Sequence, residues 1–258
     1  MTPMARRMPR LVTAWLTAML LTLAAAPLRA ETAGCGAPAE ALEATPLSGT
    51  FAALGAGQLR ILVVGSATVQ SGGTSGPAAT WPERLERTLG ARVAPGLVTV
   101  QVHGGRGTTA ADHARIIAEQ GPRFRPQLII WQLGTVEAAR GMPADDMVEA
   151  VQDAVVRLRN ARGERTDIVL MDPQFSRFFR ANADVETYRD RLRLVAMASG
   201  AQLFSRWAIM RHWAETERLD LERAPRAQRT AVADTLHDCL AQALTTFILT
   251  GARRRDRL

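Results

Sequence analysis

The fold is decided by an apolar run that ends in glycine, LRILVVG at residues 59–65. A short run of this composition is typical of a strand buried on both faces, as strands in a parallel sheet are. Similar runs follow at 97–102 (LVTVQV), 127–134 (QLIIWQLG), 167–173 (DIVLMDP) and 202–204 (QLF), and segments of helical period separate them. This alternation predicts a three-layer α/β/α sandwich around a five-stranded parallel sheet of flavodoxin-like order.

The helices are expected between and after these strands. In residues 145–161, Met147, Val151, Ala154, Val155 and Leu158 recur at helical spacing, and Thr108 or Thr109 is a candidate cap for another helix. We predict helices around residues 81–89, after Thr109, and at 145–161, 185–198, 207–219 and 234–250.

The chain divides into four parts by composition. We expect a leader at 1–30, an irregular extension at 31–58, one domain at 59–250 and a solvated basic tail at 251–258. A chain of 258 residues with 47% hydrophobic side chains is long enough to bury one sizeable core.

The net charge of +7 overstates how basic the domain is. All 32 basic residues are arginines, and four of them lie in residues 1–30, which contain no acidic residue, so the rest of the chain carries +3. Only 5% of residues are aromatic, and no arginine stripe is interleaved with stacking side chains. We therefore expect no nucleic acid among the partners.

The first thirty residues have the organisation of a secretory signal peptide. Arginines precede an apolar run from Leu11 to Ala26, and small residues follow it. We predict cleavage after Ala30 and a periplasmic or secreted protein with no stable membrane insertion afterwards. The apolar run is short for a span of about 20 residues, so an uncleaved anchor is the lesser alternative.

Two cysteines, Cys35 and Cys239, follow this leader. An oxidising compartment makes a disulfide between them possible, and two free buried thiols are the alternative. No Cys/His spacing indicates a metal site. The first strand-to-helix turn lacks G-x-G-x-x-G and no G-K-[ST] occurs, so no cofactor is expected.

Ligands of such sheets bind where the strands end. The segments that matter are therefore residues 65–68, 104–108 and 134–137, together with Asp234-Thr235-Leu236-His237 at the start of the last helix. An Asp and a His three residues apart can face one another, so that the carboxylate holds Nδ1–H and Nε2 points into the cleft. The alternative is an N-cap aspartate beside a surface histidine.

Four short segments and the Asp-x-x-His pair follow one another in the order found in the SGNH hydrolases, also called GDSL esterases. The chain most resembles an exported bacterial branch of that family. The segments are GSATV (65–69), WQLGTV (131–136), MDPQF (171–175) and MRHW (210–213). The resemblance covers roughly residues 59–250 and implies an ester hydrolase scaffold. It implies a small-molecule ester or an acylated glycan as the ligand.

The resemblance also assigns roles to positions, and two of them are substituted. The family's nucleophilic serine falls on Ala67 and its oxyanion asparagine on Val136, while its oxyanion glycine falls on Gly107 and its Asp/His pair on Asp234 and His237. Loss of a nucleophile costs about 10⁶ in turnover, and loss of one oxyanion donor about 10²–10³. We therefore expect impaired catalysis.

Three functions remain open at this point. Ser66 and Thr68 flank Ala67, but their side chains should point away from the nucleophile position, because successive side chains alternate near a strand end. A one-residue shift of the turn would place the Ser66 side chain at that position. The chain is then a weak hydrolase that uses Ser66, or water activated by His237. Otherwise it is a non-catalytic binder of an acylated or glycan ligand or a protein partner, or an interaction protein whose fold is incidental.

Overall fold

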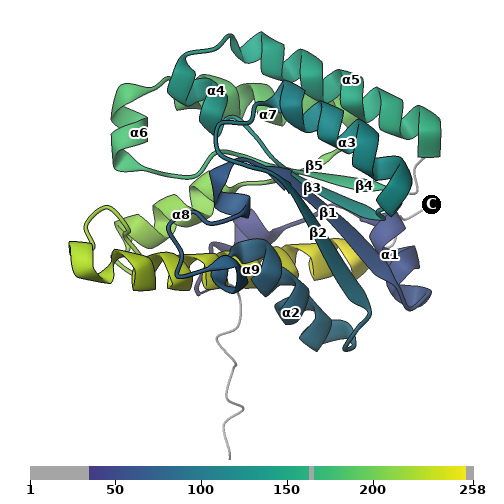
Figure 1. Ribbon diagram of the computed structural model, residues 1–258, viewed down its shortest axis with the longest axis horizontal. Coiled ribbons are helices and arrows are strands. Elements are labelled where there is room, and N and C mark those ends of the chain that lie inside the picture. Colours follow the sequence, from purple (N-terminus) through teal and green to yellow (C-terminus); the bar gives the residue numbers. More distant parts are fainter. Residues whose placement is uncertain (1–34, 163–165, 254–258) are drawn as a thin grey trace, which may run out of the picture. The chain divides into compact units, whose positions relative to one another are not determined.

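The computed structural model describes residues 35–162 and 166–253, and its centre is one parallel sheet (Figure 1). Its order is β2-β1-β3-β4-β5, which confirms the predicted flavodoxin-like sandwich. The strands are β1 (Leu59–Gly65), β2 (Val98–Gly104), β3 (Leu128–Gln132), β4 (Asp167–Met171) and β5 (Gln202–Phe204).

Helices cover both faces of the sheet (Figure 1). One face packs against α3 (Ala110–Phe124), the short α4 (Thr135–Arg140), α5 (Ala144–Arg162) and α7 (Val185–Ser199). The other packs against α1 (Ser48–Gly55), α2 (Trp81–Val93), α8 (Arg206–Glu215) and α9 (Arg229–Arg253). The short α6 (Arg177–Asn182) follows β4, and the 3-10 turn η2 (Ala67–Val69) follows β1.

The central strand β1 shows why this sequence makes a two-sided sheet. Ile61 and Val63 point into the core shared with α2 and α9, whereas Leu62 and Val64 point into the core shared with α3 and α5. All four side chains are fully buried, and each such burial stabilises the fold by about 1.5–3 kcal/mol. The strand is apolar at every one of these positions because both of its faces are covered.

The extension before β1 is not irregular throughout, which corrects the prediction for residues 31–58. Residues Ser48–Gly55 form α1. The carboxylate of Asp167, at the start of β4, accepts hydrogen bonds from the backbone N–H groups of Gly49 (3.3 Å) and Thr50 (2.6 Å). This cap comes from a residue more than a hundred positions away, so the local sequence gives no sign of it.

The last helix is longer than predicted at both ends. It begins at Arg229 rather than at residue 234, so Asp234 lies inside α9 and does not cap it. It ends at Arg253, and the Gly251 carbonyl accepts a hydrogen bond from the Leu47 N–H (3.1 Å). The predicted leader and residues 254–258 of the predicted tail lie outside the described residues.

The described residues contain no helix that is both long and apolar enough to cross a membrane.

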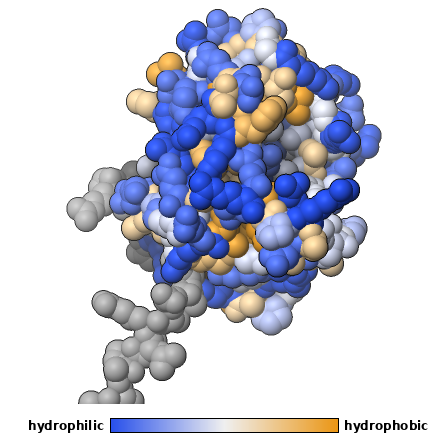
Figure 2. Space-filling model, turned by 90° about the vertical axis from the view of Figure 1, so that its left-hand side faces the viewer, coloured by the Kyte–Doolittle hydropathy of each residue, from blue (hydrophilic) through white to orange (hydrophobic). Residues whose placement is uncertain are grey.

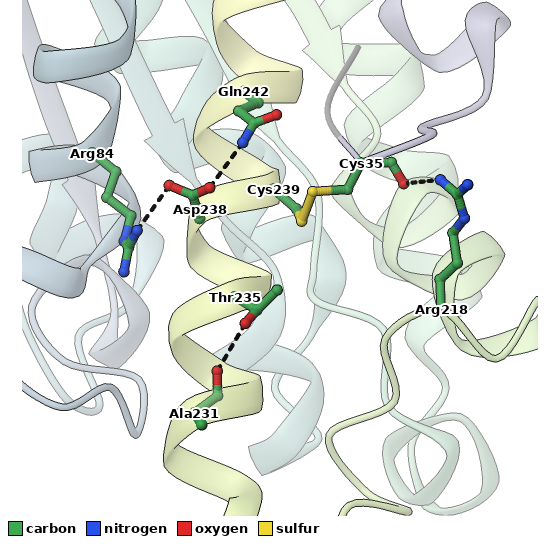
Figure 3. The surroundings of a disulfide bond; sticks show 8 residues. All are labelled: Cys35, Arg84, Arg218, Ala231, Thr235, Asp238, Cys239 and Gln242. Atoms are coloured by element: carbon green, nitrogen blue, oxygen red, sulfur yellow. Dashed lines mark hydrogen bonds and ion pairs between the residues drawn. A yellow bond between two sulfur atoms is a disulfide. The ribbon is translucent and has the colours of Figure 1, made fainter. Parts of the chain in front are cut away.

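Cys35 and Cys239 form a disulfide, which settles the alternative left open by the sequence (Figure 3). Their Cα atoms are 5.2 Å apart, and Cys239 is buried on α9. Arg218 donates to the Cys35 carbonyl (2.7 Å) on one side of the bridge, and Arg84 pairs with Asp238 (2.8 Å) on the other. The bridge therefore fixes the N-terminal extension to α9 beside His237.

Candidate functional site

The carboxyl ends of β1 and β2 meet at two glycines. Gly65 pairs with Gly104, and a Cβ at Gly104, whose φ is +110°, would lie 1.9 Å from the Gly65 carbonyl oxygen. The same oxygen accepts a hydrogen bond from the Gly105 N–H (3.0 Å). The absence of a side chain at residue 104 thus allows the two turns to pack together at the edge of the sheet where ligands bind.

A cavity of about 160 Å³ opens at this end of the molecule, which faces the viewer in Figure 2. Apolar residues are visible there between hydrophilic ones. Its walls include Thr68, Gly72, Gln174, Arg206 and His237. A wider hollow of about 730 Å³, lined in part by Phe178 and Leu221, shares Gly72 with it. A separate apolar hollow of about 430 Å³ between α3 and α5 contains none of the predicted site residues.

His237 lies in the cavity wall as a neutral ring. Its Nδ1 accepts a hydrogen bond from the backbone N–H of Trp81 (3.0 Å), which belongs to the first turn of α2 and has no acceptor within its own helix. Burial, followed by repulsion from Arg206 and Arg84, lowers the pKa of His237 to about 3. A nitrogen that accepts carries no proton, so the proton of the neutral ring is on Nε2.

Gly72 leaves room for that ring. A Cβ at residue 72, where φ is +56°, would lie 2.9 Å from the His237 Nε2. The Nε2 atom has no hydrogen-bond partner in the part of the chain that the structure describes. It therefore offers an N–H donor in a cavity wall.

Asp234 does not hold the imidazole in the predicted way. Its carboxylate accepts a hydrogen bond from the backbone N–H of Ser75 (2.9 Å), and Ser75 lowers the pKa of the Asp234 carboxyl. The expected contact at the His237 Nδ1 is replaced by the Trp81 N–H, which lies on another helix. The Asp/His arrangement of a catalytic triad is thus absent from this pair.

The residues around Ala67 are joined by the side chain of Gln132 from the end of β3. The Gln132 Nε2 donates to the Ser66 Oγ (3.2 Å), and its Oε1 accepts from the Thr68 Oγ1 (2.7 Å). Ser66 is buried, whereas Thr68 lines the same cavity as His237. The structure therefore places Thr68, and not Ser66 or Ala67, in the cavity wall, and the one-residue shift that would turn Ser66 into the cavity is not seen.

The two predicted oxyanion positions lie elsewhere. Gly107 is at the β2 end, close to the guanidinium of Arg140, and Val136 is half-buried on α4. Neither lines the cavity beside His237. Their roles, like those of the other predicted site residues, stay predictions.

Arg206 is a cavity-lining residue that the sequence analysis did not single out. Its side chain is 1% exposed, and it donates to the Thr68 Oγ1 (3.1 Å) and to the Gln174 Oε1 (3.2 Å). Burial lowers the pKa of Arg206 to about 10, against the attraction of Asp172. The available signal was an arginine directly after the fifth strand, at the carboxyl edge of the sheet.

No metal site accompanies these groups within the described residues, because no three His, Cys, Asp or Glu side chains gather there in a way that could hold an ion.

The sheet order β2-β1-β3-β4-β5 with helices on both faces is that of an SGNH-type hydrolase fold. A solved catalytic mutant of Axe2, an acetylxylan esterase from Geobacillus stearothermophilus, has this fold with a TM-score of 0.55 and 17% identity, covering 74% of this chain and 94% of that one. LAE5, an alpha/beta hydrolase enzyme from the metagenome of Lake Arreo, gives 0.54 and 17%, covering 75% and 96%. At these identities the likeness shows the fold alone.

Residues 34–254 match the Non-GDSL lipase-like family, and the chain belongs to it. None of the curated proteins matches the chain significantly.

Proposed function

We propose that this protein is a ligand-binding member of the ester hydrolase superfamily that does not form an acyl-enzyme. The observation that carries the proposal is the hydrogen bond from the Trp81 N–H to the His237 Nδ1. A general base must receive the nucleophile's proton at Nε2, and in this ring Nε2 already holds the proton. His237 therefore acts as a hydrogen-bond donor toward whatever occupies the cavity.

The neighbouring hydroxyl groups support the same conclusion. Thr68 lines the cavity, but its proton is directed to the Gln132 Oε1, and its oxygen accepts from Arg206. Ser66 accepts from Gln132 and lies outside the cavity wall. Neither hydroxyl has the hydrogen bond to an imidazole that activates a serine or threonine nucleophile.

The ligand class follows from the family and from the cavity. Small-molecule esters and acetylated sugars, or the acids released from them, suit a small cavity at the end of the sheet. Export to an oxidising compartment is part of the proposal, and the Cys35–Cys239 disulfide supports it. Cell fractionation tests export: the protein should appear in the periplasm or medium with Glu31 as its first residue.

The test of the catalytic claim is hydrolysis of p-nitrophenyl acetate together with labelling by a fluorophosphonate. Wild type is expected to stay unlabelled and to hydrolyse no faster than His237→Ala. Ala67→Ser alone is also expected to stay unlabelled, because the proton on Nε2 persists. Turnover that disappears in Ser66→Ala, Thr68→Val or His237→Ala would show a working hydrolase and overturn the proposal.

A further inference from the structure

The inner cavity presents hydrogen-bond donors to its occupant. A guanidinium has five N–H groups, and Arg206 uses two of them, on Thr68 and Gln174. Each Nη of Arg206 keeps a second N–H that no described residue accepts, and the His237 Nε2–H is likewise unused within the described residues. A ligand that satisfies these groups has to be an acceptor.

The charge of Arg206 is not balanced by a direct partner. Among the described residues no carboxylate lies within 4.0 Å of its guanidinium. The nearest acidic influence is Asp172, whose oxygens are bonded to Arg189, Ser205 and the Trp207 N–H. Burying an unpaired charge is costly, so an anion in the cavity would recover part of that cost.

Two carboxylates line the outer part of the same cavity, and both are engaged elsewhere. Glu222 accepts from the Ser176 Oγ (2.5 Å) and from the backbone N–H groups of Arg177 (2.7 Å) and Phe178 (3.3 Å). Asp220 pairs with the Arg177 side chain (3.1 Å). Their negative charge disfavours an anion near the mouth, so the anionic group of a ligand belongs at the Arg206 end.

The wider hollow that adjoins the cavity is partly apolar. Phe178 is 72% exposed and lines this hollow together with Leu221. An exposed phenylalanine beside an open hollow provides a surface for the hydrocarbon part of a ligand.

We propose that the cavity holds the carboxylate of a short-chain carboxylic acid, with the carboxylate on Arg206 and His237 and the hydrocarbon part toward Phe178. This inference rests on the proposed binding function. One cation and one neutral N–H donor match a monoanion better than a phosphate dianion. The ligand is thus the acid and not its ester, because an ester has the same shape at the carbonyl but lacks the charge that Arg206 requires.

The experiment is isothermal titration calorimetry of the purified, disulfide-bonded protein with butyrate, butyramide and inorganic phosphate at constant ionic strength. Butyramide has the shape of butyrate without its charge. A hydrogen bond to a charged group contributes enough for about tenfold or tighter binding of butyrate than of butyramide. Phosphate is expected to bind more weakly than butyrate.

Two substitutions and one control locate the site. Gln174→Glu keeps the side-chain shape and puts a carboxylate beside the Arg206 Nη2, so it should weaken butyrate binding about tenfold or more without endangering the fold. Arg206→Met should abolish the preference for butyrate over butyramide. Arg211→Gln, on the exposed side of the same helix where Arg211 pairs with Glu215, should leave butyrate binding unchanged.

Equal binding of butyrate and butyramide, tighter binding of phosphate, no binding of butyrate, or unchanged butyrate binding in Gln174→Glu would each overturn the inference. These results are separate from those on catalysis. Turnover dependent on His237 would overturn the proposed function. The carboxylate site would still be tested separately, by the ratio of butyrate to butyramide affinity.

Discussion

Two buried arginines at the same end of the sheet have different surroundings. Arg189 on α7 is 7% exposed; it donates to the Asp172 carboxylate (3.2 Å), pairs with Glu186 and lies 5.2 Å from the centre of the Trp207 ring. Arg206, the first residue of α8, is 1% exposed and bonds to two neutral side chains.

The difference separates a structural charge from a charge available to a ligand. Asp172 receives the Arg189 guanidinium, the Ser205 hydroxyl (3.0 Å) and the Trp207 N–H (2.8 Å), so both of its oxygens are satisfied although burial raises the pKa of its carboxyl. Arg189 and Asp172 therefore need no further hydrogen-bond or charge partner. Arg206 lines a cavity and keeps unused donors, which is the condition for binding an acceptor.

Arg189→Met should give the largest loss of stability, because it leaves the buried Asp172 carboxylate without its cation. Removing one member of a buried pair costs about 3–5 kcal/mol. Urea unfolding measures the change. Arg193→Met on the same helix removes an exposed pair with Asp190 and should cost no more than about 0.5 kcal/mol. Equal losses in the two variants would show that Arg189 is not structural.

Replacing both Cys35 and Cys239 with alanine tests how much the bridge to α9 stabilises the fold. Loss of a native disulfide costs about 2–5 kcal/mol, mainly because the unfolded chain gains freedom. Reduction of wild type with dithiothreitol should give a similar loss in urea unfolding. If the double variant is as stable as wild type, the bridge adds nothing to the packing of α9.

The sequence predicts the sheet well because its information is local. The apolar run at 59–65 predicts β1 to the residue, since a doubly covered strand must be apolar along its length, and the short run at 202–204 coincides with β5. The partner of His237 could not be predicted, because it is the backbone N–H of Trp81, which has no side-chain signature and lies 156 positions away. The role of Arg206 also depends on tertiary structure, which brings Thr68 and Gln174 to it.

Acidification tests whether His237 is the neutral, buried ring beside Arg206 that the structure shows. Burial first, then repulsion from Arg206, lowers the pKa of His237 to about 3, so the unfolded chain binds this proton more readily than the folded one. Stability is therefore complete above about pH 6.5 and falls as the pH decreases toward 3, by about 1.4 kcal/mol per pH unit. Between pH 7 and pH 5, wild type should lose about 2 kcal/mol more than His237→Gln in urea unfolding.

Glutamine is the suitable replacement, because its carbonyl oxygen can accept the Trp81 N–H without titrating. His113 has a pKa lowered to about 4 by burial and contributes equally in both proteins, so it cancels from the difference. An identical pH dependence in the two proteins would mean that His237 is not the neutral, buried ring described above.

Arg206→Met should change stability far less than Arg189→Met and gives the sharpest contrast with it. The variant loses hydrogen bonds to Thr68 and Gln174, but it also removes an unpaired buried charge, and the two effects are of similar size. The net change in the free energy of unfolding should stay within about 1 kcal/mol when measured in urea without added carboxylate. A loss as large as that of Arg189→Met would mean that Arg206 is held by the fold and not kept for a ligand.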